Sequence, residues 1–196
     1  MVVVLWCVAM MRARPVVAEG GAEARRLGPL GRVLSVEGCV VVTGDVFIVG
    51  GDAQDDLDAL VASVHSACGS GNPWTLNGGL VIASSVQGGT TTLTNVDALQ
   101  HLAGITGANS DGISLQIYDN AALTSVSGLR GLQGDLPGLL YVKHNPQLHT
   151  LDGLEGIAGI TGANNNGYSL EINDNAALTS VSGLRGLNGT LPGRLY

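Results

Sequence analysis

The sequence predicts a mainly β solenoid, a fold in which short strands stack as successive coils on one shared apolar core. An apolar pattern, L-x-I/V-x-x-N-x-x-L-x-x-L/V-x-x-L-x-x-L/I, recurs along the chain. Residues 97–141 align without a gap with residues 152–196, and 33 of the 45 positions are identical. Glycine is abundant, with 30 residues, whereas aromatic residues make up only 4%. This composition favours a thin aliphatic core with glycine at its corners, and a fixed internal period is typical of solenoids.

Short strands are predicted wherever the apolar pattern begins. In each L-x-I segment the two apolar side chains point inward and the residue between them points outward. The later apolar residues occur at every third position, which favours short irregular or 3₁₀-like return segments. The expected strands begin at Val46, Leu80, Leu115, Leu140, Leu170 and Leu195.

A helix is predicted early in the chain, where four acidic residues are concentrated. Carboxylates at the start of a helix complement the positive end of the helix dipole. The alternative is a calcium-binding loop, but the D-x-D-x-D-G-x5-E spacing of such a loop is absent. The acidic residues are Asp52, Asp55, Asp56 and Asp58.

An asparagine follows three of the later strands, at Asn120, Asn145 and Asn175. An asparagine amide at a turn can satisfy backbone groups that the turn leaves unpaired. Stacked coils would place the three amides above one another. We therefore predict a structural asparagine ladder.

The outward positions of the later strands form the predicted binding face. Neighbouring strands lie about 4.8 Å apart, so the outward side chains form two short columns. Two aromatic rings beside amides and one charge pair could bind a peptide, a protein edge or a sugar. The alternative is an ordinary solvated face, on which the diagonal neighbours Lys143 and Glu171 simply pair. The six residues are Gln116, Tyr118, Tyr141, Lys143, Glu171 and Asn173.

A column of two aspartates and one histidine is a candidate catalytic site. Asp119, His144 and Asp174 occupy the same turn position in successive coils. A carboxylate beside a histidine could serve as a general base. However, no Ser or Cys nucleophile stands in register, and the site would be convex rather than a pocket. The sequence therefore predicts a protein that is not an enzyme and that needs neither a cofactor nor a metal.

The charge of the chain limits its partners. The net charge is −7 and the pI about 4.8. Nucleic acids and anionic membrane surfaces call for a basic patch, so neither is an expected partner. No segment has the roughly 20 apolar residues that a membrane span requires.

The N-terminal region suits a secreted protein. Residues 2–10 are apolar, and residues 1–18 suit a secretory signal peptide, although no basic residue precedes the apolar run. The alternative is a misassigned N-terminus. We expect residues 1–36 to be leader and linker, and residues 37–196 to be the solenoid. Secretion would make the Asn188-Gly189-Thr190 sequon a glycosylation site.

Cysteine usage fits the same compartment. Cys7 lies in the apolar leader, so its removal would leave Cys39 and Cys68 as an even pair. A disulfide between them would close a loop of about 30 residues and contribute about 3–4 kcal/mol. Two buried free thiols are the alternative. A zinc site is disfavoured because neither CxxC spacing nor paired histidines accompany them.

The repeat pattern resembles that of a known family. The pattern L-x-I-x-x-N-x-x-L-x-x-L-x-G-L-x-x-L-x-x-I-x-G is similar to the receptor L domain of insulin- and EGF-receptor-like ectodomains, which is related to leucine-rich repeats. The opening segment, residues 39–48, resembles the first coil of that family. The resemblance implies a single-stranded right-handed β-helix, an extracellular place and a binding role. It also places Leu57 and Leu60 on the early helix and pairs Cys68 with the first coil.

Two features depart from that family. The 55-residue duplication is more regular than expected of the receptor lobe, and neither a transmembrane helix nor a signalling domain is present in the sequence. Leu195-Tyr196 aligns with the start of an earlier strand, and no polar cap follows the last complete coil. We therefore expect the repeat array to continue in a longer protein, the alternative being a frayed final strand. An open end could also self-associate.

These observations predict a non-catalytic extracellular or cell-surface module that binds a protein, peptide or glycan ligand. The alternative is a structural or adhesion repeat protein of a cell wall or matrix. The two hypotheses differ in what they expect after residue 196. A membrane span and a cytoplasmic domain would favour a receptor, whereas further 55-residue copies and a wall anchor would favour a structural array.

Overall fold

The computed structural model describes residues 32–36, 39–49, 53–83 and 93–196. For residues 32–36 and 39–40, and at Cys68, only the backbone is described. The predicted signal peptide, Asp52 and the Cys39–Cys68 disulfide therefore lie outside the described residues or side chains.

The described chain is mostly β structure with one α-helix. The elements in order are β1 (Arg32–Val36), β2 (Cys39–Thr43), β3 (Val46–Val49), α1 (Ala53–Cys68), β4 (Trp74–Asn77), β5 (Leu80–Ala83), η2 (Asp97–Leu99), β6 (Leu102–Ile105), β7 (Ile113–Tyr118), η3 (Ser127–Leu129), β8 (Gly134–Leu136), β9 (Leu139–Lys143), β10 (Ile157–Ile160), β11 (Tyr168–Asn173), η4 (Ser182–Leu184) and β12 (Arg194–Leu195). The η elements are single 3₁₀ turns.

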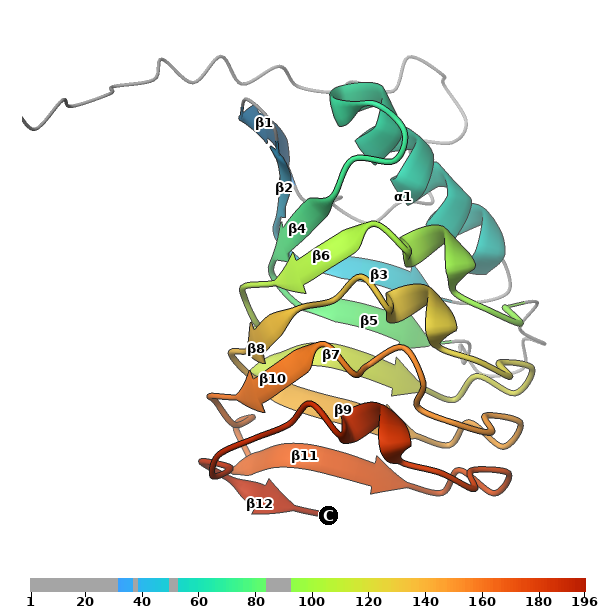
Figure 1. The fold of residues 1–196 in the computed structure, drawn as a ribbon, viewed down its shortest axis with the longest axis vertical. Helices are drawn as coiled ribbons and strands as arrows, with labels where there is room; N and C mark the ends of the chain where they lie inside the picture. The colour runs from blue at the N-terminus through green and yellow to red at the C-terminus, as the bar shows by residue number, and fades with distance from the viewer. Residues whose placement is uncertain (1–31, 37–38, 50–52, 84–92) are drawn as a thin grey trace, which may run out of the picture.

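These strands form three sheets, which Figure 1 shows along two sides of the molecule. Six strands, in the order β12-β11-β9-β7-β5-β3, form the largest sheet, and its neighbours all pair in parallel. Strands β1-β2-β4-β6 form a second sheet and β10-β8 a third. Only β1 and β2 pair antiparallel among the described strands. We call the side with β4, β6, β8, β10 and the η turns the return side.

The register of the largest sheet confirms the predicted strand positions. Its neighbouring strands pair through the first apolar residue of the pattern, and register shifts precede that residue in the β7–β9 and β11–β12 pairs. The aligned residues are Val46, Leu80, Leu115, Leu140, Leu170 and Leu195.

The predicted fold class, a mainly β solenoid built as a single-stranded right-handed β-helix with irregular or 3₁₀ returns, is wrong. The described residues form several sheets, mostly parallel, together with one helix. The return side carries the strands β4, β6, β8 and β10, where the apolar spacing predicted no strand. The antiparallel strand β1 lies in the segment predicted to be linker.

Irregular pairing explains why the apolar periodicity of the sequence did not predict the return strands. Leu102 of β6 pairs with Trp74 of β4, and Ile105 of β6 pairs with Leu76 of β4. Between these two pairs β6 advances by three residues, whereas β4 advances by two. A similar register shift interrupts the pairing of β10 with β8. An extra residue in one strand changes the inward spacing from two to three. Because a spacing of three is also typical of a 3₁₀ segment, the sequence pattern does not indicate a strand there.

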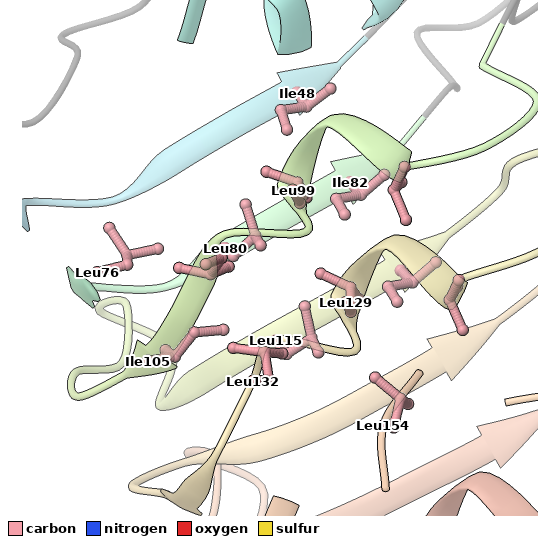
Figure 2. Packing of buried hydrophobic residues seen from close by; sticks show 14 of the residues in the cluster. Ile48, Leu76, Leu80, Ile82, Leu99, Ile105, Leu115, Leu129, Leu132 and Leu154 are labelled. Atoms are coloured by element: carbon pink, nitrogen blue, oxygen red, sulfur yellow. The ribbon is translucent and has the colours of Figure 1, made fainter. Parts of the chain in front are cut away.

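The core lies between the largest sheet and the return side. Figure 2 shows Leu80 and Leu115, from the strands, pointing towards Leu99 and Leu129 of the 3₁₀ turns. All four side chains are fully buried. Each repeat thus contributes one strand and one turn to a shared apolar layer, which no repeat could bury alone.

Helix α1 closes the core next to β3. Asp55 and Asp56 lie in its first turn, where they complement the helix dipole. Leu57, Leu60 and Val64 are buried, and their spacing of three and four places them on one helical face. The helix therefore covers the apolar end of the core near the first strands (Figure 1).

Glycine permits the close stacking of the 3₁₀ turns. A methyl group added at Gly128 would overlap the carbonyl oxygen of Val96, and one added at Gly183 would overlap that of Leu151. Both glycines are buried in η turns. The backbones of successive turns can approach this closely only because the side chain is absent.

Candidate binding site

An asparagine ladder holds the ends of the central strands. Asn145 Oδ1 accepts hydrogen bonds from Asn120 N at 3.2 Å and from Asn120 Nδ2 at 2.9 Å. Asn175 Oδ1 accepts from Asn145 N at 2.9 Å and from Asn145 Nδ2 at 3.0 Å. Asn120 and Asn145 are fully buried. The three predicted ladder residues are thus brought together, and their contacts are structural because buried amides need partners.

The acid–histidine column lies one residue before the ladder. Asp119, His144 and Asp174 all have left-handed backbone conformations, with φ of 54°, 54° and 53°. His144 Nδ1 lies 3.1 Å from Asp119 Oδ1, and His144 Nε2 lies 2.9 Å from Asp174 Oδ2. Both ring nitrogens are thus in contact with carboxylates of the neighbouring repeats. The column therefore favours a buttressing role at the turn.

The six predicted face residues lie on three adjacent strands as two columns. Gln116, Tyr141 and Glu171 align in the first column, on β7, β9 and β11. The second column aligns Tyr118, Lys143 and Asn173. All six side chains are partly buried.

Contacts between the columns fix several of these side chains. The rings of Tyr118 and Tyr141 pack edge to face, with centroids 6.3 Å apart. Glu171 Oε1 lies 3.8 Å from Lys143 Nζ and accepts a hydrogen bond from Asn173 Nδ2 at 3.2 Å. The predicted Lys143–Glu171 pair thus forms, and side chains of the second column hold Glu171 and Tyr141 of the first column in place.

A hollow of about 480 Å³ opens beside the first column. Its volume lies within the range of about 300–1,000 Å³ that is typical of small-ligand sites. The three first-column residues line it, whereas those of the second column do not. The lining residues, which define the hollow, are Asp111, Ile113, Gln116, Leu139, Tyr141, Asn164, Asn165, Asn166, Tyr168 and Glu171.

Two stacked loops form the wall of the hollow. Asn164 Oδ1 accepts hydrogen bonds from the backbone N–H groups of Asn166 and Tyr168, at 3.0 and 2.9 Å. Asn165 donates its backbone N–H to Asp111 O at 3.0 Å and its Nδ2 to Ser110 O at 3.1 Å. The later loop is therefore folded on its own asparagine and fastened to the earlier loop, so the wall is fixed without a ligand.

Most of the lining residues were missed by sequence reasoning. The predicted strands begin at Leu115 and Leu170, whereas β7 and β11 begin two residues earlier, at Ile113 and Tyr168. The N-x-x-G segments 109–112 and 164–167 were a usable signal, because asparagine side chains fold back on the backbone two residues later. The contact between the two loops leaves no such local signal.

The electrostatics of the hollow are mildly acidic. Asp111 and Glu171 line it, and none of the ten described lining residues is Lys or Arg. Partial burial, followed by the nearby Glu171 and Asp119 carboxylates, raises the pKa of Tyr141. The Tyr141 hydroxyl therefore stays protonated at neutral pH and can donate a hydrogen bond.

Other predicted sites are placed as follows. Asn188 is exposed, and its Nδ2 donates to Gly186 O at 3.2 Å. Leu195 and Tyr196, where self-association is predicted, are exposed by 66% and 65%. In the described part of the chain, no group of three or more His, Cys, Asp or Glu could hold a metal. None of the described helices has the length and apolarity that a membrane crossing requires.

No protein-family model, curated protein or solved structure matches the chain. The resemblance to the receptor L domain therefore stays a prediction.

Proposed function

We propose that the chain is a non-catalytic, ligand-binding module of a secreted or cell-surface protein, akin to the receptor L domain. One observation carries the proposal. The outward residues Gln116, Tyr141 and Glu171, from three parallel strands, converge with two fastened loops on one hollow of about 480 Å³. A concave, preformed site with aromatic and polar side chains is the usual form of a small-ligand site.

The contacts within the site favour binding over catalysis. Glu171, one of the two acids that line the hollow, is engaged by Lys143 and Asn173. His144, the histidine of the turn column, has carboxylates at both ring nitrogens. A general base needs a free acceptor within reach of the substrate proton. The groups therefore serve recognition, and we expect no turnover of a bound ligand.

The test uses an array of glycans and short peptides probed with the labelled chain. We expect saturable binding to at least one class of probe. Joint replacement of Gln116 and Tyr141 by alanine should abolish that binding, whereas Gln133→Ala, at an exposed position outside the hollow, should leave it unchanged. Binding that is absent, or that survives the double replacement, would contradict the proposal.

The extracellular location has a separate test. Asn188 is exposed, and Asn188-Gly189-Thr190 is an acceptor for N-glycosylation. Expression from the natural start in a secreting eukaryotic cell should place a glycosylated chain in the medium. Asn188→Gln should remove the added mass. A chain that stays in the cell without a glycan would contradict the location.

A structural or adhesion role is the second candidate, and a different observation favours it. The return side carries equivalent exposed contacts in both copies of the duplication. Ser127 Oγ donates to Asp97 Oδ1 at 3.5 Å, and Ser182 Oγ donates to Asp152 Oδ1 at 3.2 Å. A wall or matrix array would use such a repeated surface. This role predicts concentration-dependent assembly, which sedimentation velocity measures, and indifference to changes in the hollow.

A further inference from the structure

The duplication provides an internal comparison that bears on the hollow. The first copy, residues 97–141, and the second copy, residues 152–196, are identical at 33 of 45 positions. Most of the hollow nevertheless lies at positions where the copies differ. Of the ten lining residues, only Tyr141 and Asn164 have an identical counterpart in the other copy.

Exposure alone does not explain this concentration of differences. Thr124 and Arg130 are exposed, yet their counterparts in the second copy are the same residues. The whole segment 119–132 recurs unchanged as 174–187. Of the twelve differences, six lie on the return side and six on the strand face and its loops, at positions 110, 111, 113, 116, 118 and 139 of the first copy. Five of those six strand-side positions contribute a lining residue to the hollow, from one copy or from both.

The differences make the hollow a composite of the two copies. Ile113 and Gln116 of the first copy face one part of it, and their counterparts Tyr168 and Glu171 face another. Leu139 lines the hollow, whereas its counterpart is Arg194. Chemically different groups thus surround one space, as a site for an asymmetric ligand requires.

We propose, on the basis of the binding function above, that the hollow binds a neutral sugar ring of a glycan. Tyr141 and Tyr168 offer aromatic faces, which suit the apolar C–H face of a pyranose. Gln116, Asn166 and Asp111 offer planar groups with two polar atoms each, which match adjacent hydroxyls. Ile113 adds a small apolar contact.

Charge decides between this ligand and the alternatives. The ten described lining residues include two carboxylates and no Lys or Arg, although Arg194 Cζ lies 6.0 Å from the centroid of the Tyr168 ring just outside the lining. The net charge of the lining therefore disfavours sulfated, phosphorylated or sialylated glycans. A cationic peptide side chain is less well matched, because Lys143 Nζ lies 3.8 Å from Glu171 and partly neutralises it. A neutral polyol needs no net charge.

The experiment uses the full chain and an array of neutral, sialylated and sulfated glycans together with peptides rich in Lys and Arg. Calorimetry then measures affinity for a neutral glycan that the array retains. Tyr168→Ile installs the residue that the first copy carries at the same position, so the fold should tolerate it. We expect affinity to fall at least about tenfold. Tyr168→Phe, which keeps the ring, should retain affinity within about threefold.

Gln133→Asn is the matched control, because it also exchanges a residue between the copies but lies outside the hollow. It should leave glycan affinity unchanged. If no neutral glycan binds, or if Tyr168→Ile has no effect, the inference is wrong. Should only cationic peptides bind, with loss in Tyr168→Ile, the glycan inference fails while the binding function stands. Should no probe of any class bind, both fail.

Discussion

The return side and the strand side of the molecule have changed differently since the duplication. On the return side, Arg130 Nη2 donates a hydrogen bond to Gln100 Oε1 at 2.8 Å. The second copy has Glu155 in place of Gln100, and Arg185 Nη1 lies 3.5 Å from Glu155 Oε1, so the arginine keeps its partner despite the replacement. On the strand side, Ile113 is replaced by Tyr168 and the contacts change with it. The packed frame and the outward surface can therefore vary independently.

The physical reason lies in how closely each side is packed. The return turns touch through backbone, as at Gly128 and Gly183, so a larger side chain has no space there. Outward residues of a sheet extend towards solvent and contact their neighbours on the same face. Substitutions can thus accumulate on the strand face without disturbing the core.

The largest expected effect is at a return-side glycine. Gly128→Ala would drive a methyl group into the Val96 carbonyl, and overpacking against backbone should lower the free energy of unfolding by about 3 kcal/mol. Gly104→Ala is the control, because its nearest contact would be an ordinary 3.7 Å to Thr75 Cγ2. Urea unfolding of both variants measures the difference. Equal stability would contradict the close-packed return side.

The asparagine ladder should show the next largest effect. Asn145→Ala removes hydrogen bonds to both neighbouring ladder residues at a fully buried position. We expect a loss of about 2 kcal/mol in the free energy of unfolding. Asn175→Ala, at a partly buried position, should cost about 1 kcal/mol. Chemical denaturation would contradict the ladder if Asn145→Ala were neutral.

Alkaline pH should weaken the strand face through Tyr141. Its raised pKa means that the folded state holds the phenolic proton more tightly than the unfolded state. That contribution is fully present below the unfolded pKa of 10.0 and is lost as pH rises through the folded value. Tyr141→Phe should therefore flatten the decline of stability above about pH 10. Urea midpoints across that range measure the slope, and identical slopes would contradict the prediction.

The smallest effect is expected for an exchange on the strand face. Gln116→Glu installs the residue of the second copy at the same outward position. Its free energy of unfolding should stay within about 0.5 kcal/mol of the parent value. Thermal unfolding checks this, and a large loss would show that the outward column is as constrained as the return turns.

Part of this architecture is predictable from sequence. The positions of Leu115, Leu140 and Leu170 follow from local alternation, which a parallel register then repeats. Asn145 could be predicted as a ladder residue because its spacing repeats with the strands. The return strands could not, because register shifts alter the inward spacing at Leu102–Ile105.

The hollow lies beyond sequence reasoning for a different reason. Its wall depends on hydrogen bonds from Asn165 to Ser110 and Asp111, which lie a full duplication period away. Neither loop contains a local pattern that specifies the other. The face residues Gln116, Tyr141 and Glu171 were predictable from outward alternation, but the concavity that unites them was not.

The most direct test of the central claim is NMR chemical-shift mapping during titration with a glycan that the array retains. We expect perturbations at lining residues of both copies, such as Gln116 and Tyr168, and none at Thr124 or Arg130. Perturbations confined to the return side, or to one copy alone, would contradict a composite binding site on the strand face.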